Sequence, residues 1–61
     1  MTWKREKSGI EMTATEARDA AKRAARSIQA EKQIGKDRVR SRYSTAADNF
    51  GGYRWHVDIL E

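Results

Sequence analysis

Two short segments of the chain, residues 38–42 and 53–60, carry polar side chains at every second position, and most of these are basic. Residues of one parity point to one face of a β-strand. The arginine guanidinium is a planar fork of N–H donors that fits a phosphate or a carboxylate, and a histidine adds positive charge when protonated. If both segments are strands of one hairpin, we expect a nucleic-acid- or anion-binding face made of Arg38, Arg40, Arg42, Arg54 and His56.

Catalysis by the same residues has little support. Asp58 follows His56 on the same parity, but a nucleophile would also have to lie within reach of the histidine. Ser41 has the opposite parity and Ser44 lies at the end of its segment. No glycine-rich phosphate loop or metal-binding motif occurs, and cysteine is absent. We therefore expect a protein that is not an enzyme, with no catalytic residue, no bound metal and no cofactor.

The composition favours an anionic partner. Thirteen lysines and arginines against nine acidic residues give a formal net charge of +4. The hairpin contains no lysine, the usual charge on a solvated edge strand. The first hypothesis is a small nucleic-acid-binding module of the size encoded by phages and other mobile elements. The alternatives are a protein-binding inhibitor or regulatory adaptor that docks an acidic surface, and an arginine face that is merely solvated; DNA and RNA stay open.

A secondary basic surface is expected on a helix. Arg18, Lys22 and Arg26 recur at intervals of four residues and gather on one side of it, and Lys4 and Arg5 add charge near the N-terminus. A basic outer helix face is commonly just solvated. We rank the hairpin above the helix because the two faces would lie on opposite layers, so that one ligand could reach both only by wrapping around.

The helix is predicted over residues 13–34. Thr13 and Glu16 form a capping-box pattern at its start, and Gly35 is expected to terminate it. Small side chains line one side, which would let the helix approach a sheet closely. These are Ala17, Ala20, Ala21 and Ala24, with Ile28 one turn further on.

The remaining segments predict a sheet. Asp48-Asn49 and Gly51-Gly52 mark the turn of a hairpin over residues 38–60, in which even-numbered positions pair with even ones. Residues 1–12 are expected to form an arm or short strand broken at Gly9, with Ile10 and Met12 turned inward. The fold class is thus α+β, a single small domain with one helix on an antiparallel sheet in the order (β)αββ. The inward residues of the hairpin are Val39, Tyr43, Tyr53, Trp55, Val57 and Ile59.

The small size of the chain limits the stability that its core can provide. A domain of 61 residues buries only about 60% of the surface that its unfolded chain exposes, and leucine, isoleucine and valine are scarce. We therefore expect a marginal core and association into a homodimer. No apolar run approaches the roughly 20 residues that span a bilayer, and no secretory leader follows Met1. The expected location is cytoplasmic, without a membrane partner.

Two patterns resemble those of PepSY domains. Thr13, Glu16 and Ala17 match the family's Thr-x-x-Glu-Ala helix start, and Trp55 and Val57, with Ile59, match its closing aromatic–x–Val–x–Ile strand. The resemblance covers about the last three-quarters of the chain. It implies a helix followed by a hairpin, and a protein that inhibits or chaperones peptidases outside the cytoplasm. The absence of a leader and the basic hairpin depart from that setting.

Overall fold

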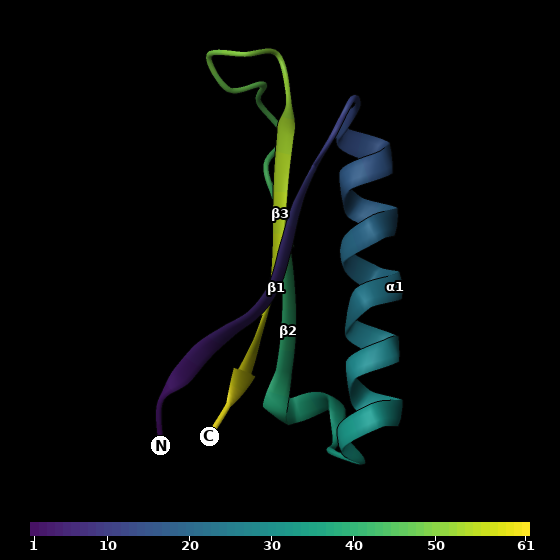
Figure 1. The fold of residues 1–61 in the computed structure, drawn as a ribbon, viewed down its shortest axis with the longest axis vertical. Coiled ribbons are helices and arrows are strands. Elements are labelled where there is room, and N and C mark those ends of the chain that lie inside the picture. The colour runs from purple at the N-terminus through teal and green to yellow at the C-terminus, as the bar shows by residue number, and fades with distance from the viewer.

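The computed structural model describes all 61 residues and contains one helix and three strands (Figure 1). Strand β1 (Trp3–Glu11) is followed by helix α1 (Ala14–Lys32), the short 3-10 helix η1 (Lys36–Arg38), strand β2 (Val39–Tyr43) and strand β3 (Tyr53–Leu60). The strand–helix–strand–strand order confirms the predicted α+β class.

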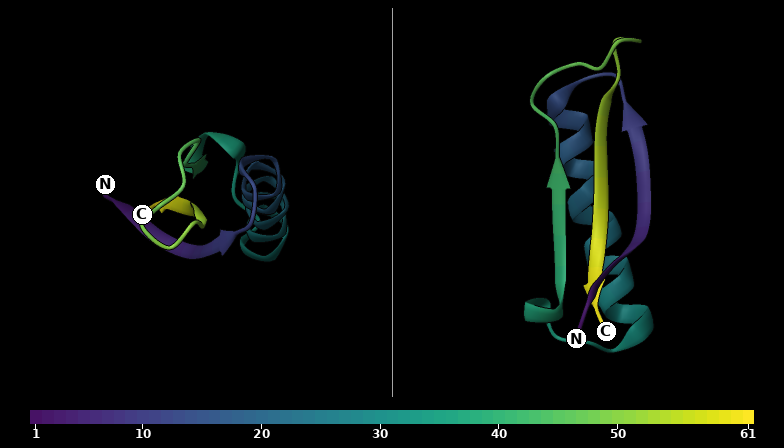
Figure 2. Two further views of the ribbon diagram at one scale, coloured as in Figure 1. Left: turned by 90° about the horizontal axis from the view of Figure 1, so that it is seen from above. Right: turned by 90° about the vertical axis from the view of Figure 1, so that its left-hand side faces the viewer.

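The three strands form one antiparallel sheet in the order β1-β3-β2. The last strand of the chain therefore lies in the centre. Helix α1 packs on one side of this sheet, and no element covers the other side (Figure 2). We call this uncovered side the open face.

The core lies between the helix and the sheet. The alanine stripe of α1 meets the inward residues of the hairpin, as expected: Ala17 and Val57 are fully buried, and Trp55 is 8% exposed. Tyr43, at the end of β2, stays exposed although its parity is inward. The buried apolar cluster consists of Ala17, Ala21, Ala24, Ala25, Ile28, Val39, Trp55, Val57 and Ile59.

Helix α1 begins as its sequence predicts. The backbone N–H of Glu16 donates to Oγ1 of Thr13, and the Thr13 hydroxyl donates to the Glu16 carboxylate, each over 3.1 Å. The predicted end is wrong. The helix stops at Lys32, and Gln33 adopts the left-handed conformation (φ 53°) in place of Gly35, which has φ −73° and opens η1.

The prediction for residues 1–12 is wrong in two respects. Strand β1 continues through Gly9, and Ile10 and Met12 are 57% and 83% exposed. The cause is a β-bulge between Arg5 and Lys7, because one extra residue reverses the parity of the rest of the strand. Gly9 thereby faces the helix side, and Ile10 faces away from it.

The hairpin has the predicted register. Arg40 pairs with Asp58 and Tyr43 with Trp55, so even positions face even ones. The strand, however, begins at Val39, because Arg38 is the last residue of η1. No helix is long and apolar enough to cross a membrane.

Candidate anion-binding face of the sheet

The register of the sheet gathers basic side chains on the open face. Asp58 of β3 has Arg5 of β1 on one side and Arg40 of β2 on the other. His56 is flanked in the same way by Ser8 and Arg42. Paired residues of antiparallel strands point to the same face. With Arg54 of β3, the basic residues of the open face are Arg5, Arg40, Arg42, Arg54 and His56.

Asp58 is the buried centre of this face. Its residue is 6% exposed, and three basic groups surround its carboxylate. Nε of Arg40 lies 3.2 Å away, Nε2 of His56 3.5 Å and Nε of Arg5 3.8 Å. A carboxylate removed from water needs such partners. Asp58 therefore acts as an internal counterion that holds Arg5 and Arg40 in place beside His56.

The arginines keep most of their donors free. Arg5, Arg40 and Arg54 each contact a carboxylate through Nε, and a guanidinium has five N–H donors. The terminal nitrogens, which form the outer edge of each fork, have no partner in the protein. Arg42 is exposed and makes no ion pair. The face thus offers several unused forks next to one another.

Arg38 has a different role from the one the sequence predicts. Its terminal nitrogen donates to the backbone carbonyl of Leu60 over 3.1 Å, and its Nε is buried without a hydrogen-bond partner. The side chain therefore links η1 to the end of β3. The structure brings the other four predicted hairpin residues together and leaves Arg38 outside the group.

The secondary basic surface divides between the two layers. Arg18, Lys22 and Arg26 are exposed on α1, on the opposite side from the open face. Lys4 pairs with Ile59 and shares its orientation toward the helix layer. Arg5 joins the hairpin residues on the open face. Sequence reasoning could not place Arg5 there, because its partner Asp58 lies near the other end of the chain.

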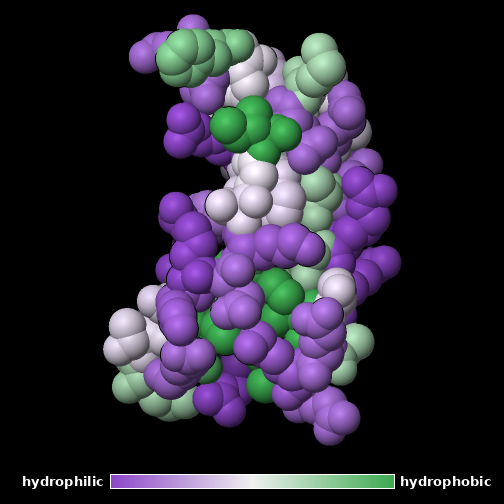
Figure 3. Space-filling model, viewed as in Figure 1, coloured by the Kyte–Doolittle hydropathy of each residue, from purple (hydrophilic) through white to green (hydrophobic).

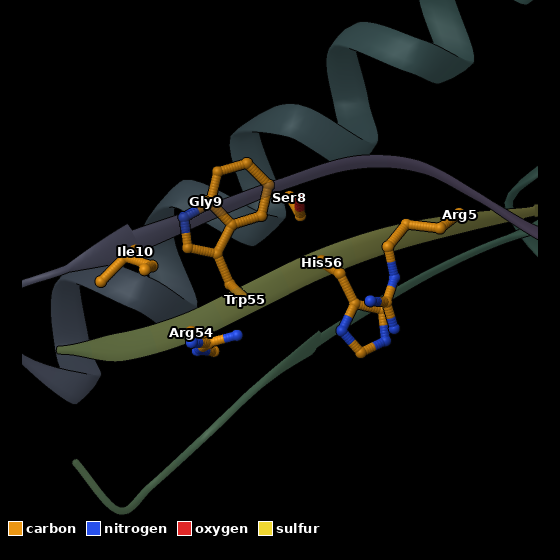
Figure 4. A pocket seen from close by; sticks show the side chains of 7 residues that line it. All are labelled: Arg5, Ser8, Gly9, Ile10, Arg54, Trp55 and His56. Atoms are coloured by element: carbon orange, nitrogen blue, oxygen red, sulfur yellow. The ribbon is translucent and has the colours of Figure 1, made fainter. Parts of the chain in front are cut away.

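A recess lies on the open face between β1 and β3. Its volume is about 460 Å³, and its polar lining is Arg5, Ser8, Arg54 and His56. The side chains of Arg5, Arg54 and His56 project to the same side of the sheet (Figure 4). In Figure 3 the open face forms the left-hand edge of the molecule, which is notched between two groups of hydrophilic side chains. Ser8 is not among the site residues that the sequence pattern predicts.

An aromatic ring extends the face toward the chain termini. The guanidinium of Arg40 lies over the ring of Trp3, 4.4 Å from its centroid, a cation–π contact. Trp3 is paired with Leu60 at the end of β3. The Trp3 ring contacts the guanidinium of Arg40, while Asp58 binds its Nε. Arg40 is thus fixed in two directions.

The loop of residues 44–52 closes the opposite end of the face. Nε of Arg54 lies 3.2 Å from Oδ2 of Asp48. Backbone N–H groups of Gly52 and Phe50 donate to the same carboxylate and, with Arg54, hold the pKa of Asp48 below its usual value of 3.8. The loop therefore carries a stable negative charge that orients Arg54.

The chemistry of the face is that of charge and hydrogen-bond donation. His56 contacts Asp58, and no hydroxyl group hydrogen-bonds to the imidazole. No group of three or more His, Cys, Asp or Glu residues is arranged to hold a metal ion. No family model, curated protein or solved structure matches the chain.

Proposed function

We propose that this protein is a small, non-enzymatic module that binds nucleic acid through the open face of its sheet. One observation carries the proposal: an uncovered β-sheet presents four arginines and a histidine, and their only buried counterion is Asp58. Each fork that is anchored at Nε keeps its terminal donors without a hydrogen-bond partner in the protein. Such forks bind backbone phosphates in a bidentate manner, as they also bind carboxylates.

The anchoring supports binding in a second way. Long side chains lose conformational entropy when a ligand immobilises them. Arg40 is already held by Asp58 and Trp3, and Arg54 by Asp48. Preorganised donors therefore bind a phosphate at a lower entropic cost than free ones. A nucleic-acid partner is consistent with the expected cytoplasmic location.

Protein binding is the second candidate. The outer edge of β2 has no neighbouring strand, and an unpaired edge can accept a strand from another chain. Such a partner would suit an inhibitor or regulatory adaptor, the function that the PepSY resemblance implies. The same edge offers a route to the expected homodimer. An acidic protein would also be attracted to the basic face, and its binding would also weaken with added salt. The salt dependence of binding alone therefore does not separate the two candidates.

The experiment compares two double variants of equal charge. Arg5→Gln with Arg42→Gln removes two exposed open-face cations. Neither donates a hydrogen bond within the protein, and Arg5 makes only the 3.8 Å ion pair with Asp58, which keeps its closer partner Arg40. Arg18→Gln with Lys22→Gln removes two cations from the helix side. Binding to labelled DNA and RNA is measured by fluorescence anisotropy over a range of salt concentrations.

We expect four phosphate contacts, which give a log–log salt slope of about −3.6 for duplex DNA and about −2.8 for single strands. The open-face variant should weaken binding to every sequence and flatten the slope by about 1.8 or 1.4 respectively. The helix variant should keep nearly the parent slope. Equal effects of the two variants, or no binding by the parent at low salt, would contradict the proposal and favour a protein partner.

A further inference from the structure

Phe50 is the most exposed large apolar side chain of the protein. It is 94% exposed and lies in the loop between β2 and β3, at the top of the molecule in Figure 1. An aromatic ring left in water contributes nothing to the core. The ring is therefore free to contact a partner outside the folded chain.

The backbone beneath Phe50 is ordered by one carboxylate. Oδ1 of Asp48 accepts hydrogen bonds from the N–H groups of Phe50 and Gly52, each over 2.9 Å. The Asp48 N–H donates to the Gly52 carbonyl over 2.8 Å, and the Gly51 N–H donates to the Asp48 carbonyl over 3.0 Å. Gly51 supplies the left-handed conformation (φ 82°) that this turn requires. Phe50 is therefore presented on a defined turn.

The turn is also attached to the open face. Arg54 lines the recess and binds Oδ2 of Asp48 through Nε. The Ser44 N–H donates to the Arg54 carbonyl over 2.8 Å. Gly52 packs so closely against Ile10, another residue of the recess, that a β-carbon there would collide with it. The turn that carries Phe50 thus stands at the end of the basic face, and its Asp48 binds Arg54, one of the arginines of that face.

We infer that Phe50 stacks on an unpaired base of a single-stranded nucleic acid whose phosphates lie along the open face. This inference rests on the proposed function and specifies the form of its ligand. Aromatic rings next to a positively charged surface bind single strands by base stacking, with little dependence on sequence. A duplex hides the faces of its bases, so only unpaired bases can use the ring. DNA and RNA share this chemistry.

The test uses Phe50→Ala with Met12→Ala as the control. Met12 is 83% exposed and lies at the same end of the molecule, in the turn between β1 and α1 (Figure 1), but it has no ring. Binding is measured on a thymine homopolymer, a uracil homopolymer and a DNA duplex of equal length. Thermal unfolding of each variant checks that the fold is intact.

Phe50→Ala should weaken single-strand binding by about 5- to 150-fold, the range expected when 1–3 kcal/mol of stacking is lost. The salt slope should not change, because the ring neutralises no phosphate. Phe50→Trp should restore the affinity, and Met12→Ala should match the parent. Comparison of the two homopolymers shows whether DNA or RNA is preferred.

Three results would overturn the inference. If Phe50→Ala binds single strands as the parent does, the ring does not stack, and the proposed function survives. If the variant loses affinity for duplex and single strands equally and its salt slope flattens, the loop acts by holding Arg54. If the parent binds no nucleic acid, the proposed function fails as well, and Phe50 becomes a candidate anchor for a protein partner.

Discussion

Gly9 shows how a single missing side chain shapes the sheet. It lies in β1 opposite Trp55, and a β-carbon at Gly9 would lie 2.7 Å from three atoms of the indole ring. The ring covers the glycine, and its Nε1–H donates to the Glu11 carboxylate over 3.1 Å. The largest side chain of the core therefore depends on the smallest residue of β1.

Gly9→Ala should destabilise the protein by about 1–3 kcal/mol, the usual cost of overpacking. Gly35→Ala is the matched control: its β-carbon would meet only Oδ1 of the exposed Asp37 side chain, which can move, and its φ of −73° suits alanine. That change should stay within about 0.5 kcal/mol. Urea unfolding followed by tryptophan fluorescence measures both. Equal stability of the two variants would mean that the indole does not cover Gly9.

Asp48 gives the loop of residues 44–52 a pH dependence. Its pKa is lowered from 3.8 by the Gly52 and Phe50 N–H groups and by Arg54, so the folded loop favours the charged carboxylate. The stabilisation is present above the usual pKa and is lost as the pH falls through the lowered one. Amide shifts of Phe50 and Gly52 should therefore move only as the pH falls below 3.8, the usual pKa of this carboxyl.

Asp48→Asn provides the control for this titration. The amide keeps an acceptor oxygen for the two backbone N–H groups but does not ionise in this range. The shifts should then be flat below pH 4. A parent protein whose Phe50 and Gly52 amides also stay flat would show that the carboxylate does not organise the turn.

At the scale of elements, helix α1 depends on its first turn. The helix packs through small alanine side chains, which bury little area each, so local stabilisation of the helix matters. Thr13→Ala removes the capping hydroxyl and should cost about 1 kcal/mol. Thr15→Ala, within the same exposed turn, removes a hydroxyl that makes no hydrogen bond and should be nearly neutral. Thermal melts followed by circular dichroism compare them; similar losses for both would argue against the cap.

Strand β1 marks the limit of prediction from the sequence. Alternation in the hairpin and the small-residue stripe in the helix sufficed for the order of elements, the register and the inward residues of the hairpin except Tyr43, which is exposed. The bulge between Arg5 and Lys7 has no local signature, and without it the parity of Ile10 and Met12 comes out reversed. The same bulge decides that Arg5 and Ser8 share one face.

The site was harder to predict than the fold because it depends on contacts between distant segments. Alternation placed Arg40, Arg42, Arg54 and His56 on one face. Alternation could not show that Asp58 would be buried among these residues. Nor could it show that Arg38 would donate a hydrogen bond to the Leu60 carbonyl. Those outcomes depend on three-dimensional distances that no spacing in one segment encodes.

At the scale of the whole molecule, the charge is divided between two sides. The open face carries arginines around a buried carboxylate, and the helix side carries a separate exposed stripe that includes Arg18 and Arg26. Net charge alone would attract a polyanion to both sides. The two sides differ in their structure, however. Only the open face combines arginines fixed by carboxylates, a recess lined by basic side chains and the exposed ring of Phe50 at its end.

The most direct test is an NMR titration of the arginine side-chain Nε–Hε signals with a single-stranded oligonucleotide. We predict that the signals of Arg5, Arg40, Arg42 and Arg54 shift progressively at low salt, while those of Arg18 and Arg26 stay in place. Added salt should reverse the shifts. Shifts centred on the helix arginines, or equal small shifts on both sides, would contradict the central claim that the open face of the sheet is the binding surface.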